Sequence, residues 1–252
     1  MIYDATDIAE RYDSARHLPD ATKRLWLEAI TADIPIASIQ TIVDIGCGTG
    51  RFSEALSDAF DSEVIGIDSS GTMLERAKRN TSSGRVYFCR GKADRLPLLD
   101  WSACFVYLSM VYHHLGNPSA AAREFARILR QGGFLCIRNS TSDLMDRVPY
   151  LKYFPTAVEI NRRRLPSNRE IKENLRLNGF TLLRHQIIEQ EFANSFGDYV
   201  DKISQRGLSD LASIPDRDFV AGIERMKNSL ANDGENGPVV EPIDLFSFTK
   251  AS

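Results

Sequence analysis

One segment constrains the fold of this chain more than any other: residues 43–56, VDIGCGTGRFSEAL. An apolar run contains Asp44 near its end, and a pattern with helical spacing begins just after the turn that follows. Three glycines occupy alternate positions of this turn: Gly46, Gly48 and Gly50. Glycine has no Cβ atom to keep a ligand off the backbone, and the first turn of a helix offers unpaired N–H groups. The segment therefore predicts a buried strand, a ligand-binding turn and a helix.

Strand and helix patterns alternate over about the first 140 residues, which is typical of a mostly parallel sheet covered on both faces. The expected strands are 41–45, 62–68, 85–90, 103–109 and 134–140. Two helices are expected at 51–60 and 71–80, and a third opens at Pro118 and stops at Gly132 and Gly133. This order predicts an α/β, doubly wound fold.

The second half of the chain interrupts this alternation twice. Residues 141–166 contain prolines and clustered aromatic side chains, and residues 192–232 are largely polar and helix-prone. A helix at 167–180, a strand at 181–192 and a last strand at 243–250 complete the pattern. We expect a single domain over 1–252, with lid insertions at approximately 141–166 and 192–232.

Composition excludes several other classes of protein. Hydrophobic residues at 43% and charged residues at 26% are ordinary for a globular chain. The longest uncharged apolar run, 103–112, is far shorter than the roughly 20 residues of a membrane span. The acidic N-terminal residues do not resemble a signal peptide. We expect a cytoplasmic protein that does not enter a membrane.

Neither the cysteines nor the histidines form a metal-binding pattern. The four cysteines are scattered without a C-x-x-C pair, which predicts reduced thiols: Cys47, Cys89, Cys104 and Cys136. No H-E-x-x-H motif is present, so no metal is expected.

Charge gives little support for a nucleic-acid partner. The formal net charge is −3, so the chain as a whole does not attract polyanions. Residues 160–185 nevertheless hold most of their charge as arginine and lysine. Such a run is usually a solvated helix face, and the alternative is local attraction of an anionic substrate.

Two cofactor classes compete for the glycine turn. The strand after it ends in Asp68, which could accept hydrogen bonds from ribose hydroxyls. Dinucleotide-binding proteins use G-x-G-x-x-G, whereas this chain has the tighter G-C-G-T-G with Asp44 two residues before it. A carboxylate there would repel a pyrophosphate but suits a ligand with an ammonium group. The arrangement favours S-adenosylmethionine over NAD.

These segments resemble the class I S-adenosylmethionine-dependent methyltransferases, particularly the small-molecule group with the ubiquinone/menaquinone-biosynthesis and trans-aconitate methyltransferase-like enzymes. VDIGCGTGRFS is similar to the first motif of the family, and 64–78, VIGIDSSGTMLERAK, to the second. Residues 91–115 are similar to a later block, although Lys92 replaces the usual aspartate. The resemblance implies a Rossmann-like methyltransferase fold, a seven-stranded sheet with an antiparallel last strand. The cofactor would be S-adenosyl-L-methionine and the product S-adenosyl-L-homocysteine.

The resemblance also implies a set of cofactor-binding residues. These are Tyr12, Arg16, Asp44, Gly46, Cys47, Gly48, Gly50, Asp68, Ser69, Met73, Ala93, Asp94 and Ser109. Asp44 and the glycines would surround the methionine portion, while Asp68 would hold the ribose. Since a lysine accepts no hydrogen bond, the backbone of Ala93 and the side chain of Asp94 are expected to replace the adenine contact of the usual aspartate.

Residues after the fourth strand are candidates for the chemistry. Methyl transfer from a sulfonium requires alignment and exclusion of water, and a base where the acceptor must lose a proton. His113 and His114 follow this strand and are the candidate catalytic residues. The candidate substrate-binding residues are Met110 beside them and the lid aromatics Tyr150, Tyr153, Phe154 and Tyr199.

The favoured function is methyl transfer to a small-molecule acceptor, most readily on oxygen, with nitrogen and carbon open. One alternative is an S-adenosylmethionine-binding regulatory or scaffold protein without turnover. Another is an RNA methyltransferase, suggested by the basic run at 160–185. The expected partner is a small acceptor without nucleic acid or membrane, and the chain is expected to be a monomer or homodimer.

Overall fold

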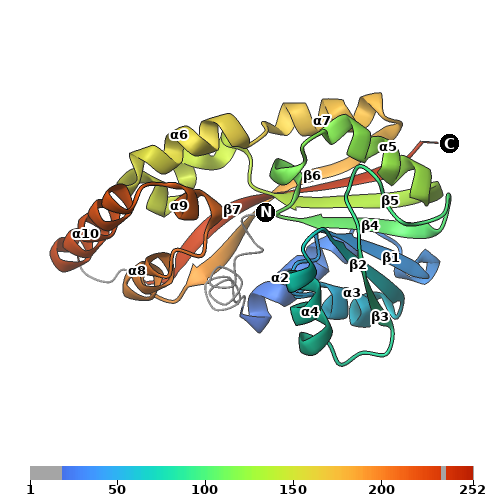
Figure 1. Ribbon diagram of the computed structural model, residues 1–252, viewed down its shortest axis with the longest axis horizontal. Helices are drawn as coiled ribbons and strands as arrows, with labels where there is room; N and C mark the ends of the chain where they lie inside the picture. Colours follow the sequence, from blue (N-terminus) through green and yellow to red (C-terminus); the bar gives the residue numbers. More distant parts are fainter. Residues whose placement is uncertain (1–18, 234–236, 252) are drawn as a thin grey trace.

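The computed structural model describes residues 19–233 and 237–251, and a seven-stranded sheet forms its centre (Figure 1). The strand order is β3-β2-β1-β4-β5-β7-β6. The strands are β1 (Thr41–Ile45), β2 (Glu63–Asp68), β3 (Val86–Arg90), β4 (Ala103–Ser109), β5 (Leu129–Asn139), β6 (Phe180–Ala193) and β7 (Val239–Lys250). Strands β1 to β5 pair in parallel, and β7 pairs antiparallel with both β5 and β6. The predicted doubly wound α/β fold with an antiparallel last strand is confirmed.

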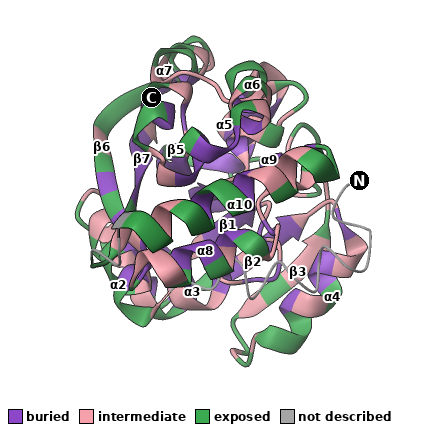
Figure 2. Cartoon of the chain, turned by 90° about the vertical axis from the view of Figure 1, so that its left-hand side faces the viewer, coloured by how far each residue is buried: buried purple, intermediate pink, exposed green. Residues whose placement is uncertain are grey.

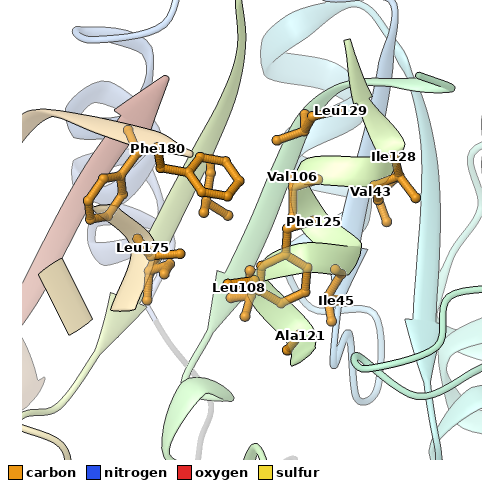
Figure 3. Close-up of a cluster of buried hydrophobic side chains, with 14 of the residues drawn as sticks. Val43, Ile45, Val106, Leu108, Ala121, Phe125, Ile128, Leu129, Leu175 and Phe180 are labelled. Carbon is orange, nitrogen blue, oxygen red and sulfur yellow. The ribbon is translucent and has the colours of Figure 1, made fainter. Parts of the chain in front are cut away.

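Helices cover both faces of this sheet because its inner strands are apolar on both sides. They are α2 (Asp20–Thr31), α3 (Ser53–Phe60), α4 (Gly71–Asn80), α5 (Pro118–Ile128) and α7 (Asn168–Leu177), with a short 3-10 helix η2 (Ile36–Ser38) before β1. Phe125 of α5 and Leu175 of α7 belong to one buried cluster with the side chains of β1 and β4 (Figure 3). Trp26 of α2 and Leu56 of α3 belong to a second cluster.

Side-chain caps fix where several of these helices begin. The Ser70 hydroxyl accepts a hydrogen bond from the Met73 N–H at the start of α4, directly after the tip of β2. Asn117 caps α5 through the Ala120 N–H, with Pro118 in the first helical position. The first cap starts α4 three residues after the end of β2, whereas α5 begins nine residues after the end of β4, beyond the short 3-10 helix η3 (Tyr112–His114).

The predicted end of α5 was wrong. The helix stops at Ile128, and Gly132 and Gly133 lie inside β5. The strand begins early because Leu129 pairs with Ala103 of β4, and the register then shifts before the next pair. Gly132 has a φ of +69° within this irregular stretch. Pairing with a distant strand thus outweighs the local glycine signal for a helix end.

The two interruptions of the alternation form a helical lid beyond the carboxyl ends of the parallel strands (Figure 1). Its parts are η4 (Ser142–Arg147), η5 (Pro149–Tyr153), α6 (Pro155–Arg164), α8 (Phe196–Ser204), α9 (Ser209–Ser213) and α10 (Asp216–Asp233). Figure 2 views the lid from outside, with α8 and α10 in front of the sheet. A third buried cluster, which includes Phe154, Tyr199 and Met226, holds the lid together. In the described residues, no helix combines the length and the apolar character that crossing a membrane requires.

Candidate active site

The glycine turn combines left-handed backbone conformations with one close contact. Gly46 and Gly48 have φ angles of +67° and +57°, a region that favours glycine. A Cβ atom on Gly46 would lie 2.3 Å from the Val111 side chain, so only glycine lets the segment after β4 approach the turn. A Cβ atom on Gly48 would meet nothing within 4 Å, because Gly48 borders a cavity. The turn therefore packs on one side and leaves space on the other.

This cavity has a volume of about 800 Å³ and lies at the carboxyl ends of β1, β2 and β4. Open α/β sheets bind ligands at this position. Predicted site residues from distant parts of the sequence line it together: Gly46, Gly48, Asp68, Ser69, Met73, Ala93, Asp94, Ser109, Met110 and His114. Lys92 also lines the cavity, next to Ala93 and Asp94, the two residues predicted to replace the adenine contact of the aspartate that is usual at position 92.

Asp68 is held in place by backbone N–H groups from two sides. Its Oδ2 accepts a hydrogen bond from the Gly48 N–H at 3.0 Å, and its Oδ1 accepts one from the Ser70 N–H at 2.8 Å. Charge-assisted bonds of this kind are stronger than neutral ones. The carboxylate therefore joins the glycine turn to the tip of β2 and lies in the wall of the larger cavity.

Asp44 lies behind the turn and not in the main cavity. It borders a small cavity of about 20 Å³ together with Cys47, Arg51 and Ser109. Its carboxylate accepts a hydrogen bond from the Ser53 hydroxyl at 2.7 Å. Burial raises the pKa of Asp44 from 3.8 to about 7, and the Ser53 bond opposes this only in part. Burial also raises the pKa of the Cys47 thiol, so the neutral thiol is part of the packing around the turn.

The raised pKa of Asp44 gives the ligand-free protein a defined dependence on pH. The unfolded chain ionises near pH 3.8 while the folded chain keeps its proton to about pH 7, so stability from this group is lost as pH rises between these values. We expect the free energy of unfolding of Asp44→Asn, relative to that of the parent, to increase by a few kcal/mol as pH rises from about 4 to about 7. Above pH 7 this difference should stay constant. Urea unfolding from pH 4.5 to 8 measures this difference. A difference independent of pH would contradict the assignment.

Gly48 offers a test of whether the large cavity binds the cofactor. The new methyl group of Gly48→Ala would enter the cavity, and its left-handed backbone would cost about 1–2 kcal/mol of stability. Gly132→Ala is the matched control, because Gly132 has a φ of +69° and open space around it but lies in β5. We expect similar stability losses and a weaker S-adenosylhomocysteine affinity, by about tenfold or more, for Gly48→Ala alone. Calorimetric titration and thermal unfolding measure the two effects, and equal affinities in the two variants would contradict this placement.

Besides Asp44 and Cys47, one more predicted cofactor residue in the described part of the chain, Gly50, does not line the main cavity. A Cβ atom on Gly50 would lie 3.0 Å from the ring of Phe88 and 3.2 Å from Ala77, so this glycine permits close packing of the turn against β3 and α4. Tyr12 and Arg16 lie outside the described residues.

A second cavity, of about 90 Å³, lies between the sheet and the lid. Met110, Arg164 and Ser209 line both cavities, so the two spaces meet at these residues. Met110 adopts a φ of +58°, an uncommon conformation for a side-chain-bearing residue, and its N–H donates to the Arg138 carbonyl at 2.7 Å. The segment after β4 thus turns sharply where the cavities meet.

The lid aromatics differ in their relation to this second cavity. Tyr150 lines it, and its hydroxyl donates to Asp210 at 2.6 Å. Tyr153, Phe154 and Tyr199 do not line it and belong to the buried cluster of the lid. Their apolar packing therefore holds the lid together.

Sequence reasoning missed a polar group on the sheet side of this cavity. Arg138 is 2% exposed, donates to Gln190 Oε1 at 2.6 Å and to Ser109 Oγ at 3.1 Å, and lies over the Trp26 ring. The Trp26 indole N–H donates to the same Gln190 oxygen at 3.1 Å. The sequence indicates this group only through the position of Arg138 within the apolar run FLCIRNS. An arginine is almost never fully buried without partners, so an arginine in a buried strand predicts polar groups around it.

The two histidines face different cavities. His113 lines the smaller cavity and His114 the larger one, and their ring centroids are 4.1 Å apart. Asn139 Nδ2 donates to the Ser140 carbonyl at 2.6 Å, so its Oδ1 is the acceptor for His113 Nδ1 at 3.0 Å. This bond places the proton of neutral His113 on Nδ1 and the lone pair on Nε2. Among the described residues, no three His, Cys, Asp or Glu side chains are grouped as metal ligands.

Comparison with known proteins agrees with this architecture. Residues 43–137 match a family described as a methyltransferase domain. A demethylmenaquinone methyltransferase of Staphylococcus aureus is 28% identical over 199 residues, which cover 75% of this chain and 83% of that protein. A demethylmenaquinone methyltransferase of Lactiplantibacillus plantarum is 31% identical over 159 residues, 60% of this chain and 67% of that one.

Solved structures share the fold at lower identity. A protein of Anabaena variabilis, assigned as a methyltransferase of an antibiotic biosynthesis pathway, has a TM-score of 0.71 and 22% identity, covering 89% of this chain and 96% of that one. A Haemonchus contortus phosphoethanolamine N-methyltransferase, solved with S-adenosylhomocysteine, has a TM-score of 0.63 and 17% identity. The match covers 100% of this chain and 59% of the Haemonchus contortus chain.

The sheet order and the glycine-lined cavity define a Rossmann-like methyltransferase. Together with the sequence relatives, they show that the chain belongs to the class I S-adenosylmethionine-dependent methyltransferases. Its cofactor is S-adenosylmethionine, and the residues present fit this ligand, because the open side of Gly48 and the fixed Asp68 carboxylate border the same cavity. The bound cofactor supplies a methyl group on a sulfonium, which is already a good leaving group.

Proposed function

We propose that this enzyme methylates a small-molecule acceptor, with an oxygen atom as the nucleophile. The observation that carries the proposal is the meeting of two cavities at Met110, with His113 lining the smaller one. In the larger cavity, the cofactor residues predicted from the sequence hold the methyl donor. In the smaller cavity, His113 Nε2 takes the proton of the acceptor hydroxyl, and Asn139 keeps the ring in the required tautomer.

The lid favours a small acceptor. The space between the lid and the sheet is about 90 Å³ and is bordered by polar side chains such as Asn161 and Gln190. Closure over this space excludes water from the transfer step. We propose that the whole chain, 1–252, is one methyltransferase domain that includes the lid, and that it acts in the cytoplasm as a monomer or homodimer.

A demethylmenaquinone-type acceptor is the second candidate, because both sequence relatives described above are named as demethylmenaquinone methyltransferases. Such a substrate would attack through an atom other than oxygen, or it would need a larger space than the smaller cavity offers. Product analysis separates the two candidates, since the position of the added methyl group differs.

We propose that nucleic acid is not the acceptor. Two arginines of the basic run are exposed and paired with neighbouring glutamates: Arg162 with Glu159 at 2.7 Å and Arg176 with Glu173 at 2.8 Å. Local pairing of this kind reduces the field available to a polyanion. Salt-sensitive RNA retention by the protein, lost on neutralising Arg162 and Arg163, would favour the RNA alternative instead.

The proposed function is tested with methyl-labelled S-adenosylmethionine and a pool of small metabolites. We expect S-adenosylhomocysteine and one labelled product in equal amounts, with fragmentation in the mass spectrometer locating the methyl group on oxygen. Tight cofactor binding without S-adenosylhomocysteine formation against any acceptor would support the regulatory or scaffold alternative.

A further inference from the structure

The basic run at the end of α6 has two kinds of arginine. Arg162 and Arg163 are exposed, and Arg162 is paired with Glu159 on the same helix. Arg164, the next residue and the last of α6, is only partly exposed and lines both cavities. Arg164 is therefore the position where this run enters the site.

The guanidinium of Arg164 has few partners for a partly buried charge. Its Nη2 donates to Asn161 Oδ1 at 3.2 Å, and its Nε is buried without a hydrogen-bond partner. It forms no ion pair with any residue in 19–233 or 237–251. A charged group taken partly from water is costly unless it is paired, so this arrangement indicates a partner supplied by a ligand.

Asn161 fixes the direction of this guanidinium. The Asn161 Nδ2 donates to Asp210 Oδ2 at 2.8 Å, so its oxygen is the atom that accepts from Arg164. Asp210 also accepts bonds from the Tyr150 hydroxyl at 2.6 Å and the Leu211 N–H at 2.9 Å. The Asp210 carboxylate, which borders the smaller cavity, therefore accepts hydrogen bonds from neutral donors. The side-chain amide of Asn161 lies between this carboxylate and Arg164.

We propose that Arg164 binds an oxyanion of the methyl acceptor, so that the substrate is a small organic acid. A guanidinium binds a carboxylate or a phosphate through two parallel hydrogen bonds, which fixes orientation as well as charge. Because Arg164 and Met110 line both cavities, an anion held by Arg164 is close to where donor and acceptor meet. This inference rests on the proposed function and assigns its substrate class.

The test uses a small-metabolite extract separated by anion exchange at neutral pH. With labelled S-adenosylmethionine, the retained fraction should be methylated and the flow-through should not. Treatment of the retained fraction with a phosphatase distinguishes the two oxyanions, since it removes a phosphorylated acceptor and leaves a carboxylic acid. Either result agrees with the inference.

Variants of Arg164 then connect the anion to this side chain. We expect Arg164→Met to lower kcat/KM for the retained fraction by about 10- to 100-fold, the range for a charged hydrogen-bond partner. Arg164→Lys should lie between, because it keeps the charge without the planar fork. Arg163→Met is the matched control on the same helix and should resemble the parent. Affinity for S-adenosylhomocysteine should equal that of the parent in Arg163→Met, and in the two Arg164 variants it should fall by much less than kcat/KM, because Arg164 also lines the larger cavity.

Three results would overturn the inference while leaving methyl transfer intact. They are activity confined to the flow-through, equal kcat/KM for Arg164→Met and Arg163→Met, and a loss of S-adenosylhomocysteine affinity in Arg164→Met that matches its loss of kcat/KM. The last would assign Arg164 to the cofactor. Absence of methyl transfer by the parent enzyme with every fraction would instead overturn the proposed function itself, and the inference with it.

Discussion

Replacing His113 by alanine is expected to lower the rate of methyl transfer about 100-fold or more, the usual contribution of a positioned base. The reason is geometric, since Asn139 holds the Nδ1 proton and leaves the lone pair on Nε2, in a residue that lines the acceptor cavity. Single-turnover transfer from labelled S-adenosylmethionine measures the chemical step. Affinity for S-adenosylhomocysteine should stay the same, because His113 does not line the larger cavity.

His114→Ala is the matched control for this substitution. The neighbouring ring lines the larger cavity, the proposed cofactor site, and does not line the smaller one, so its loss should affect cofactor affinity more than the chemical step. Asn139→Ala should reproduce part of the His113 defect by releasing the tautomer, without removing the base. Equal rates in the His113 and His114 variants would exclude a catalytic role for His113.

Replacing Asp68 by alanine should weaken binding of S-adenosylhomocysteine by about 1.5–3 kcal/mol, roughly 10- to 150-fold. Two effects contribute in the same direction. The variant loses the carboxylate that we propose accepts hydrogen bonds from the ribose hydroxyls, and with it the group that fixes the Gly48 and Ser70 N–H groups. Isothermal titration calorimetry measures the affinity, and hydrogen exchange of these two amides should increase in the variant.

Asp58→Ala provides the control for Asp68. Asp58 is an exposed carboxylate on α3 and lines neither cavity, so its removal changes the net charge equally without touching the site. An Asp68 variant with the affinity of the Asp58 variant would contradict the ribose assignment.

The first half of the fold could be predicted from sequence because its signals are local. Strand β1 is a short apolar run, and the helix α3 follows the glycine turn closely. The spacing of apolar residues therefore predicts both elements to within a few residues. The end of α5 was missed because it depends on Leu129 pairing with Ala103. Such a pairing leaves no mark in the immediate sequence.

The candidate site was predictable to the same extent and for the same reason. Residues of the glycine turn and of the β2 tip belong to contiguous motifs, whereas Trp26, Arg138 and Gln190 meet only after the chain has folded. The lid shows most clearly how far a sequence pattern can predict the site, because its aromatic pattern predicted that both Tyr153 and Phe154 contact the substrate. Both are buried in the lid cluster, since helices that leave the sheet need an apolar interior of their own.

The position of β7 has a consequence for how this protein is made. The strand at 239–250 lies between β5 and β6, with all of α8, α9 and α10 preceding it in the chain. During synthesis, β6 therefore has no strand partner until the residues of β7, up to Lys250, have left the ribosome. The lid and the far edge of the sheet should become ordered together, late and in one step. Nascent chains arrested before residue 239 should be captured by chaperones and sensitive to proteases.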